Sequence, residues 1–225
     1  MITLDGPGVA PKAGGKAKQL VVFLHGYGSN GDDLISLAPY WADLLPEAEF
    51  LSPNAPFPCE INPFGGFQWF GLEDRRPEMV LGSTRAAAAI LDGFLDAQLQ
   101  ARGLDERSLA LVGFSQGTMM SLHVGPRRAT APAAIVGYSG LLVLPPDNNG
   151  EAFAAEIKAR PPVLLVHGDQ DDLIPPQALF QATQGLAAIG VPVEWHLSTG
   201  VGHGIDGEGL RHGGEFLARR FTGRG

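Results

Sequence analysis

Residues Leu109 to Gly117 read Leu-Ala-Leu-Val-Gly-Phe-Ser-Gln-Gly, an apolar run that ends in a Gly-x-Ser-x-Gly turn centred on Ser115. The apolar run predicts a buried strand, and the absence of a helix breaker from Gln116 until Gly125 predicts a helix. A sharp strand-to-helix turn lifts a serine hydroxyl clear of the sheet edge, where a base and oxyanion donors can reach it. The stretch therefore predicts that Ser115 is a nucleophile.

The pattern alone is weak evidence because the chain is rich in glycine. With 31 glycines in 225 residues, about 0.17 chance matches to the pattern are expected. A Gly-Ser turn that merely closes a βα unit is the structural alternative. The rest of the chain must therefore supply the partners that a nucleophilic serine needs.

Length and composition limit the class of protein. A chain of 225 residues with 44% hydrophobic and 18% charged residues suits a single α/β domain over residues 1–225. The apolar runs are too short to span a bilayer, and the first residues do not resemble a secretory signal, so we expect a cytoplasmic protein. The single cysteine, Cys59, excludes an internal disulfide and a thiolate-rich metal site. A formal net charge of −8 disfavours nucleic acid and anionic membranes as partners.

Short apolar runs alternate with helical patterns along the chain. Strands are expected at residues 20–24, 50–51, 109–112, 133–136, 163–166 and 193–197. Helices are expected at residues 32–45, 83–102, 116–123, 151–159, 176–189 and 208–221. This alternation predicts an α/β fold, a mostly parallel sheet with helices on both faces. Because ligands meet such sheets at the carboxyl ends of the strands, the residues that follow each strand are the candidates for chemistry.

A nucleophilic serine needs a histidine base. His203 is the best candidate because it lies in a glycine-rich loop between the last expected strand and the last expected helix. The other five histidines lie inside expected strands or helices or come too early in the chain; they are His25, His123, His167, His196 and His212.

The histidine in turn needs a carboxylate that orients it. Asp169, Asp171 and Asp172 all follow the strand expected at 163–166 and precede His203, which gives the chain order serine, acid, histidine. Turn chemistry favours Asp171, because Asp169 is better placed to accept backbone N–H groups and Asp172 is offset by one residue.

Several motifs resemble, in order, those of the phospholipase/carboxylesterase family, which includes the acyl-protein thioesterases. They are His25-Gly26-Tyr27-Gly28, Trp69-Phe70 after Asn54-Ala55-Pro56, Gly113-Phe114-Ser115-Gln116-Gly117, His167-Gly168-Asp169-Gln170-Asp171 and Gly202-His203. The resemblance spans residues 20–220 and implies an α/β-hydrolase fold with little or no separate cap domain. It implies that Ser115 is the nucleophile, His203 the general base and Asp171 the orienting acid.

The same resemblance implies an oxyanion hole formed by the backbone N–H groups of Tyr27 and Gln116. For Gln116 the physics agrees, since it begins the helix after Ser115, where unpaired N–H groups and the helix dipole favour an anion. Most relatives carry leucine at the position of Tyr27, so the tyrosine alters the pocket and not the donor.

Residues 57–70 are rich in aromatic side chains, although proline and glycine mark the segment as a loop. Phe67, Trp69 and Phe70 are predicted to bind an apolar acyl group as one wall of a pocket, and Met119 to contact the same group. The alternatives are packing of the loop onto the sheet and, for Met119, an ordinary core position. The segment could equally form a homodimer interface.

The predicted reaction is two-step hydrolysis of a carboxylic ester with a short to medium acyl chain, through an acyl-enzyme and with no metal or organic cofactor. Acyl-protein thioesterase and lysophospholipase activities are alternatives on the same machinery, because each substrate presents a carbonyl. A noncatalytic module that only binds a small ligand is the alternative from another class, and the complete serine, acid and histidine set disfavours it. A metal-dependent hydrolase built on His25, His167 and His203 lacks HExxH or HxH spacing.

Overall fold

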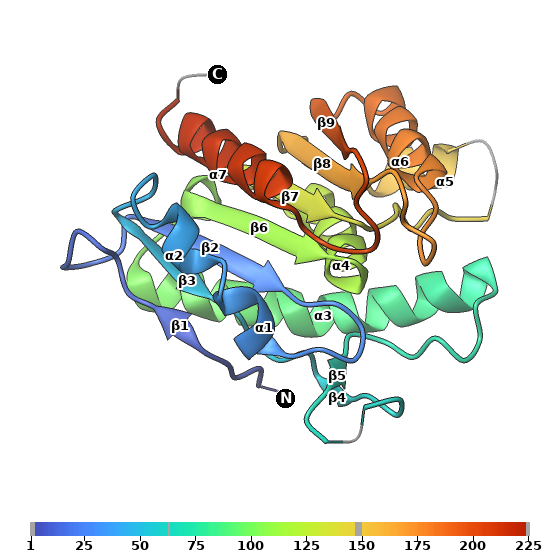
Figure 1. Ribbon diagram of the computed structural model, residues 1–225, viewed down its shortest axis with the longest axis horizontal. Coiled ribbons are helices and arrows are strands. Elements are labelled where there is room, and N and C mark those ends of the chain that lie inside the picture. The colour runs from blue at the N-terminus through green and yellow to red at the C-terminus, as the bar shows by residue number, and fades with distance from the viewer. Residues whose placement is uncertain (1–2, 63, 147–149, 224–225) are drawn as a thin grey trace.

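The computed structural model describes residues 3–62, 64–146 and 150–223, and one seven-stranded sheet runs through the centre of these residues (Figure 1). The spatial order is β1-β3-β2-β6-β7-β8-β9. Within this sheet, among the described residues, only β1 runs antiparallel to its neighbour, and the other six strands are parallel to one another. The strands are β1 Gly8–Val9, β2 Gln19–Leu24, β3 Ala48–Leu51, β6 Leu109–Phe114, β7 Ala134–Tyr138, β8 Val163–Gly168 and β9 Val193–Ser198.

Helices cover both faces of this sheet (Figure 1). One layer contains α1 Gly31–Ile35, α2 Ala38–Trp41 and α7 Gly207–Phe221. The other contains α3 Pro77–Arg102, α4 Gln116–Val124, α5 Glu151–Glu156 and α6 Gln177–Ala188. Side chains along β2 alternate between the two apolar cores: Val21 and Phe23 pack in the first, and Leu20, Val22 and Leu24 in the second. Strands buried on both faces read as continuous apolar runs, which is why the sequence pattern located them.

The structure confirms the predicted α/β-hydrolase fold, a single domain with a mostly parallel central sheet and helices on both faces. Each expected strand is present, with ends moved by one or two residues. The single helix expected over residues 32–45 is wrong, because the segment forms the short helices α1 and α2 with Ser36 and Leu37 between them. Pro39 lies in the first turn of α2, where its missing N–H costs no hydrogen bond.

Two further differences concern residues 57–102. Helix α3 begins at Pro77, six residues before the expected start at Ser83. The aromatic segment, expected as a loop, contains a two-stranded antiparallel ribbon of β4 Phe57–Pro58 and β5 Phe67–Gln68. The ribbon stands apart from the main sheet in Figure 1. Among the described residues, no helix combines the length and the apolar character needed to cross a membrane.

Candidate active site

Ser115 occupies the turn between β6 and α4, in a backbone conformation that residues with a Cβ rarely adopt. Its φ is 54° and its ψ is −114°. The Ser115 N–H donates to the carbonyl of Tyr138 at 2.9 Å, and the Thr118 hydroxyl bonds the carbonyls of Gly113 at 2.9 Å and Tyr138 at 2.8 Å. These bonds hold the turn at the carboxyl ends of β6 and β7, as the Gly-x-Ser-x-Gly pattern predicts.

The two glycines of this turn are required by close backbone approach. A Cβ on Gly117 would lie 1.7 Å from the carbonyl oxygen of Leu24, and one on Gly113 would lie 2.4 Å from the backbone of Gly117. No side chain fits at either distance. Helix α4 therefore packs directly against the ends of β2 and β6, which fixes where the Ser115 side chain lies.

Asp171 and His203 form the hydrogen bond that a charge-stabilised histidine base needs. The Asp171 side chain is fully buried after β8, and its Oδ2 lies 2.8 Å from His203 Nδ1. The other oxygen, Oδ1, accepts the N–H groups of Leu173 at 3.0 Å and Ile174 at 2.8 Å. With both carboxylate oxygens occupied, the His203 proton is placed on Nδ1 and Nε2 is left as the basic nitrogen.

The loop that carries His203 is fastened to the ends of the neighbouring strands. Asp169 Oδ1 accepts the N–H of Gly200 at 2.7 Å, and the Gln170 N–H donates to Val201 at 2.9 Å. The hydroxyl of Ser139, a residue with φ of 44°, donates to the carbonyl of Gly204 at 3.2 Å. Asp169 thus accepts a backbone N–H, as the turn chemistry suggested, whereas Asp172 is exposed.

His167 is a site residue for which sequence reasoning found no role. Its Nε2 lies 2.8 Å from the carbonyl oxygen of Ile174 and 3.3 Å from Asp171 Oδ2, and its side chain is almost fully buried. It therefore braces both the acid and the turn that holds the acid. In the sequence, His167 follows the strand expected at 163–166 and opens the His167-Gly168-Asp169-Gln170-Asp171 motif, but neither signal indicates this role.

Ser115 and His203 line one cavity of about 690 Å³. Its wall is largely apolar, and the acidic and basic side chains that line it, besides His203, are Glu60, Glu73 and Arg75. Among the described residues, no hydrogen bond joins the Ser115 hydroxyl to His203. Such bonds are often longer in ligand-free enzymes and tighten when substrate binds. The apolar lining is formed by Ile61, Leu72, Val80, Phe114, Met119, Leu141, Leu173 and Ile174.

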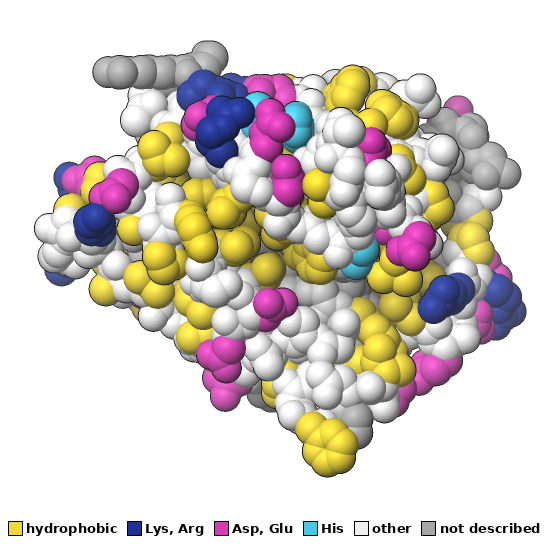
Figure 2. Space-filling model, viewed as in Figure 1, with side chains coloured by type: hydrophobic (Ala, Val, Ile, Leu, Met, Phe, Trp, Pro, Cys, Tyr) yellow, Lys and Arg dark blue, Asp and Glu magenta, His cyan; other side chains and the backbone are white. Residues whose placement is uncertain are grey.

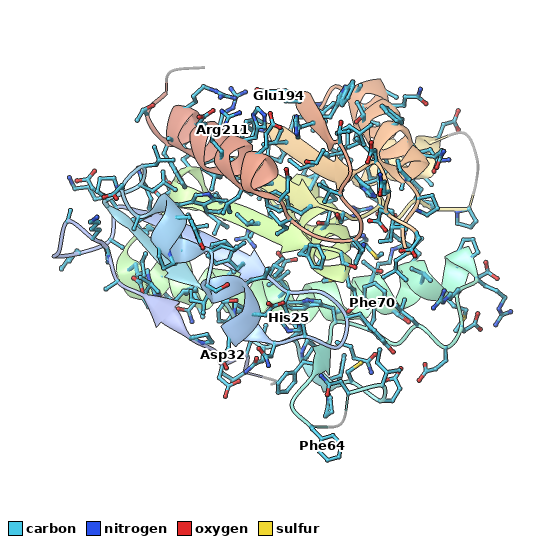
Figure 3. The ribbon with its side chains drawn as sticks, in the orientation of Figure 1. His25, Asp32, Phe64, Phe70, Glu194 and Arg211 are labelled. Carbon is cyan, nitrogen blue, oxygen red and sulfur yellow. The ribbon has the colours of Figure 1, made fainter. Side chains whose placement is uncertain are left out.

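Phe67, Trp69 and Phe70, which were predicted to bind substrate, do not line this cavity, whereas Met119 does. Trp69 is fully buried and donates from Nε1 to the carbonyl of His25 at 3.0 Å. Phe70 is buried in the core beside α3 and α4, and Phe67 packs partly against the same core. The structure thus favours the packing alternative for these three residues. The exposed end of the segment is Phe64, which points into solvent at 97% exposure (Figure 3) and projects from the surface in the same view of the space-filling model (Figure 2).

The Gln116 side chain links the aromatic segment to the nucleophile turn. Its Oε1 accepts the N–H of Trp69 at 2.9 Å, and its Nε2 donates to the carbonyl of Phe70 at 2.7 Å. The residue is 1% exposed, so both bonds are shielded from water. Sequence reasoning assigned a role to the backbone of Gln116 and found none for its amide.

The two residues predicted to form the oxyanion hole both lie at the cavity. Tyr27 and Gln116 both line the cavity, and among the described residues neither backbone N–H has a hydrogen-bond acceptor. The Tyr27 hydroxyl donates to Glu60, which holds the pKa of that carboxyl below its usual range. Burial and this hydrogen bond raise the pKa of Tyr27. The rim of the cavity therefore carries a persistent negative charge at Glu60.

His25 and His167 are occupied by structural hydrogen bonds. Nε2 of His25 accepts the N–H of Ala55 at 2.9 Å, and burial lowers the pKa of this histidine. His167 Nε2 is committed to Ile174 and Asp171. This use of both rings disfavours a metal-dependent hydrolase built on His25, His167 and His203.

His123 lies inside α4, away from these contacts, and burial lowers its pKa to about 4.

Comparison with known proteins places this geometry in context. A family model described as Phospholipase/Carboxylesterase matches residues 7–220. The chain is 24% identical over 213 residues to acyl-protein thioesterase 1 of Gibberella zeae, covering 89% of this chain and 90% of that protein. It is 27% identical over 214 residues to esterase YpfH of Escherichia coli K12, covering 92% and 84%. Among solved structures, esterase PE8 superposes with a TM-score of 0.88 at 42% identity, covering 96% of this chain and 98% of that one.

Proposed function

The chain belongs to the phospholipase/carboxylesterase family of hydrolases, and on that premise we propose that Ser115, His203 and Asp171 hydrolyse a carboxylic ester. The protein is a carboxylesterase-type serine hydrolase, as its esterase and thioesterase relatives are named. The observation that carries the residue assignment is the 2.8 Å bond between Asp171 and His203 in a loop that shares a cavity with Ser115.

The first half-reaction forms an acyl-enzyme. Nε2 of His203 takes the proton from Ser115 as Oγ attacks the substrate carbonyl carbon. Asp171 stabilises the imidazolium that results, and the N–H groups of Tyr27 and Gln116 donate to the new oxyanion. The tetrahedral intermediate collapses when His203 returns the proton to the leaving alcohol or thiol.

The second half-reaction releases the acid. Water enters the site, His203 removes its proton, and the resulting hydroxide attacks the acyl carbonyl. The same two N–H donors hold the second oxyanion. Collapse then returns the proton to Ser115 and regenerates the free enzyme. Every proton is carried by His203, so this sequence of steps needs only the groups named above.

The cavity suggests the substrate class. A volume of about 690 Å³ with a mainly apolar wall suits a small ester with a short to medium acyl chain. A thioester is the second candidate, because three of the matched relatives are named acyl-protein thioesterase 1. A series of p-nitrophenyl esters of increasing chain length, with a matched thioester series in parallel, separates these two candidates.

The experiment that tests the nucleophile is Ser115→Ala. We expect turnover of a short p-nitrophenyl ester to fall to the background rate and covalent labelling by a fluorophosphonate to be lost. Ser36→Ala is the matched control, since Ser36 is an exposed serine of the connection between α1 and α2 and does not line the cavity. Labelling that persists in Ser115→Ala, measured by intact mass, would reject Ser115 as the nucleophile.

Location and assembly belong to the same proposal. We expect the protein to act in the cytoplasm on a small ester or thioester, as a single domain over residues 1–225. A homodimer through the aromatic segment is supported by the exposure of Phe64 at the end of the ribbon. Cell fractionation tests the location. The molar mass in solution, measured by light scattering for the wild type and for Phe64→Ser, tests the dimer.

A further inference from the structure

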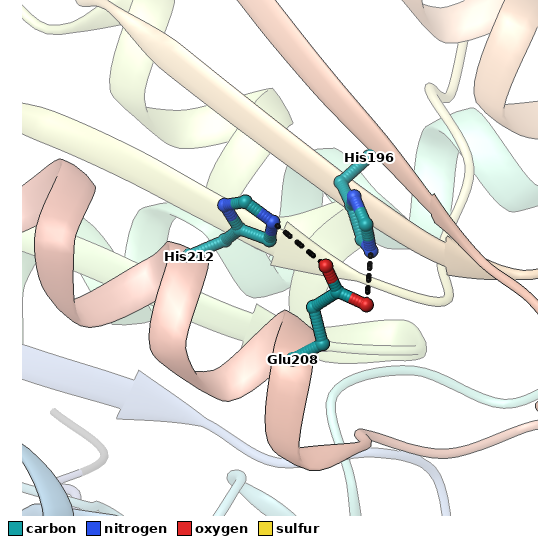
Figure 4. Close-up of side chains that lie close together, drawn as sticks. All are labelled: His196, Glu208 and His212. Carbon is teal, nitrogen blue, oxygen red and sulfur yellow. Dashed lines mark ion pairs between the residues drawn. The ribbon is translucent and has the colours of Figure 1, made fainter.

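Three possible metal ligands meet between β9 and α7. His196 comes from β9, and Glu208 and His212 come from α7 (Figure 4). Among the described residues, these three offer ligand atoms that all lie within 4.8 Å of one another. None of the three lines the cavity at Ser115. We propose that they form a binding site for a divalent transition-metal ion, Zn²⁺ in particular.

The distances are close to those of a bound site. Glu208 Oε2 lies 4.0 Å from His196 Nε2, and Glu208 Oε1 lies 3.6 Å from His212 Nε2. Ligand atoms about 2.0–2.1 Å from a tetrahedral Zn²⁺ are about 3.3 Å apart, so these pairs need to close by less than about 1 Å. Glu208 and His212 are four residues apart on one helix face, and the Glu208 side chain is 58% exposed and free to turn.

An unpartnered nitrogen points to a ligand at this position. His196 Nε2 is buried and has no hydrogen-bond partner among the described residues. A buried polar atom without a partner costs free energy, so it is expected to have one in the working protein. The nitrogen faces the Glu208 carboxylate (Figure 4), and the rings of His196 and His212 lie 4.4 Å apart between centroids. An ion held between the three side chains would satisfy it.

The backbone around these ligands is already fixed. Alternate residues of β9 face α7. The residues two positions before and two positions after His196, Glu194 and Ser198, both bond to α7 or to its N-cap residue. Glu194 pairs with Arg219 at 2.9 Å and Arg220 at 2.7 Å. Ser198 donates to Asp206 Oδ1 at 2.7 Å, and Asp206 caps α7 by accepting the N–H of Gly209. Binding of an ion therefore requires only side-chain movement.

The donor set and the local charge define the ion. Two imidazoles and one carboxylate suit Zn²⁺ and its first-row neighbours and are poor ligands for Mg²⁺ or Ca²⁺. Arg211 is the competing cation, because its Nη2 lies 3.3 Å from His212 Nε2 and 3.8 Å from Glu208 Oε1. Its guanidinium is held chiefly by Glu215, at 2.9 Å to both carboxylate oxygens, so it can yield His212 without losing its main partner.

The residues of the proposed metal site lie before and after the loop that carries His203 in the sequence. His196 lies before this loop and Glu208 after it, and His203 lies between them. A bound ion would tie the end of β9 to the first turns of α7 and so restrict the motion of the loop. The ion has no part in the reaction chemistry. This consequence for His203 rests on the proposed function, whereas metal binding does not.

The test is titration of the full chain, stripped with a chelator, with zinc chloride in a calorimeter and in thermal unfolding. We expect one Zn²⁺ per chain and a rise in Tm of about 5–10 °C at 100 times the Kd. Loss of a residue that only hydrogen-bonds to a metal ligand typically weakens metal binding by about 10–100-fold. His196→Gln and His212→Gln each remove a ligand itself, so each should weaken Zn²⁺ binding by more than this. Glu208→Gln, at an exposed position, gives the same test without risk to folding.

Two further variants sharpen the result. Arg211→Gln removes the competing cation and should tighten Zn²⁺ binding, an outcome that a merely structural ion-pair cluster does not predict. Asp32→Asn removes a surface carboxylate from the same helical layer (Figure 3) and should leave the Kd unchanged. No saturable binding, or binding equal in the wild type and both histidine variants, would overturn the proposal. Either result leaves the assignment of Ser115 untouched.

Discussion

Asp171→Asn tests the assignment of the acid most directly, because the structure dictates how the amide must sit. Oδ1 of Asp171 holds the N–H groups of Leu173 and Ile174, so the amide oxygen of the variant must occupy that position. The amide NH₂ then faces His203 Nδ1. Two donors cannot share one hydrogen bond, so His203 is forced into the tautomer with its proton on Nε2.

In that tautomer the ring cannot accept the proton of Ser115, and the imidazolium loses its counter-charge. We expect kcat to fall by about 10⁴, the cost of this change in serine proteases, which corresponds to about 5.5 kcal/mol of transition-state stabilisation. KM should change little, because Asp171 does not line the cavity. The Tm should also change little, since both backbone hydrogen bonds to Oδ1 are retained.

The assay is steady-state hydrolysis of p-nitrophenyl butyrate, with thermal unfolding measured on the same samples. Asp169→Asn is the matched control, because Asp169 lies two residues away and binds Gly200 and not His203. It should keep kcat within about threefold of the wild type. A kcat for Asp171→Asn within tenfold of the wild type, with the fold intact, would refute the assignment. So would an equal loss in both variants.

Two further predictions concern stability. Gly117→Ala should prevent folding or lower the Tm by more than about 10 °C, because its Cβ would lie 1.7 Å from the Leu24 carbonyl oxygen. Gly93→Ala is the control, because a Cβ at this position of α3 meets open space. This variant should stabilise the fold by about 0.5–1 kcal/mol. The pKa of His123 is lowered to about 4, so the unfolded chain takes up its proton first as pH falls below about 6.5. Between pH 7.5 and 5 the wild type should therefore lose about 2 kcal/mol more than His123→Gln in urea unfolding, and equal losses would contradict the assigned burial cost.

The sequence predicted the buried strands well because strands covered on both faces are apolar at every position. The run from Leu109 into Ser115 is the clearest example, since a strand, a turn and a helix are each marked by residue type. The prediction of one helix over residues 32–45 was wrong because the apolar residues keep their helical spacing on both sides of the break between α1 and α2. Ser36 and Leu37 carry no strong breaker signal, and Pro39 lies where a new helix tolerates it.

At the site, sequence reasoning located residues that chain order and turn chemistry constrain, and missed those that only packing defines. Asp171 and His203 lie after β8 and β9, where a parallel sheet collects its functional side chains. The cavity wall is formed instead by apolar residues such as Leu72, Leu141 and Leu173, which are scattered over several loops, two helices and the end of β6. The denser aromatic cluster at Trp69 and Phe70 was the stronger compositional signal, and it proved to be core.

The two hydrogen bonds from the Gln116 side-chain amide to the backbone of Trp69 and Phe70 have a consequence for redesign of the enzyme. The backbone N–H of the same residue is the proposed oxyanion donor, so the 69–70 segment and the donor cannot move independently. Attempts to enlarge the acyl site by replacing Trp69 or Phe70 should therefore lower turnover even where the new substrate fits. Ile61 and Leu173 line the cavity at exposed positions and take no part in these hydrogen bonds, so they are the better places to change chain-length preference.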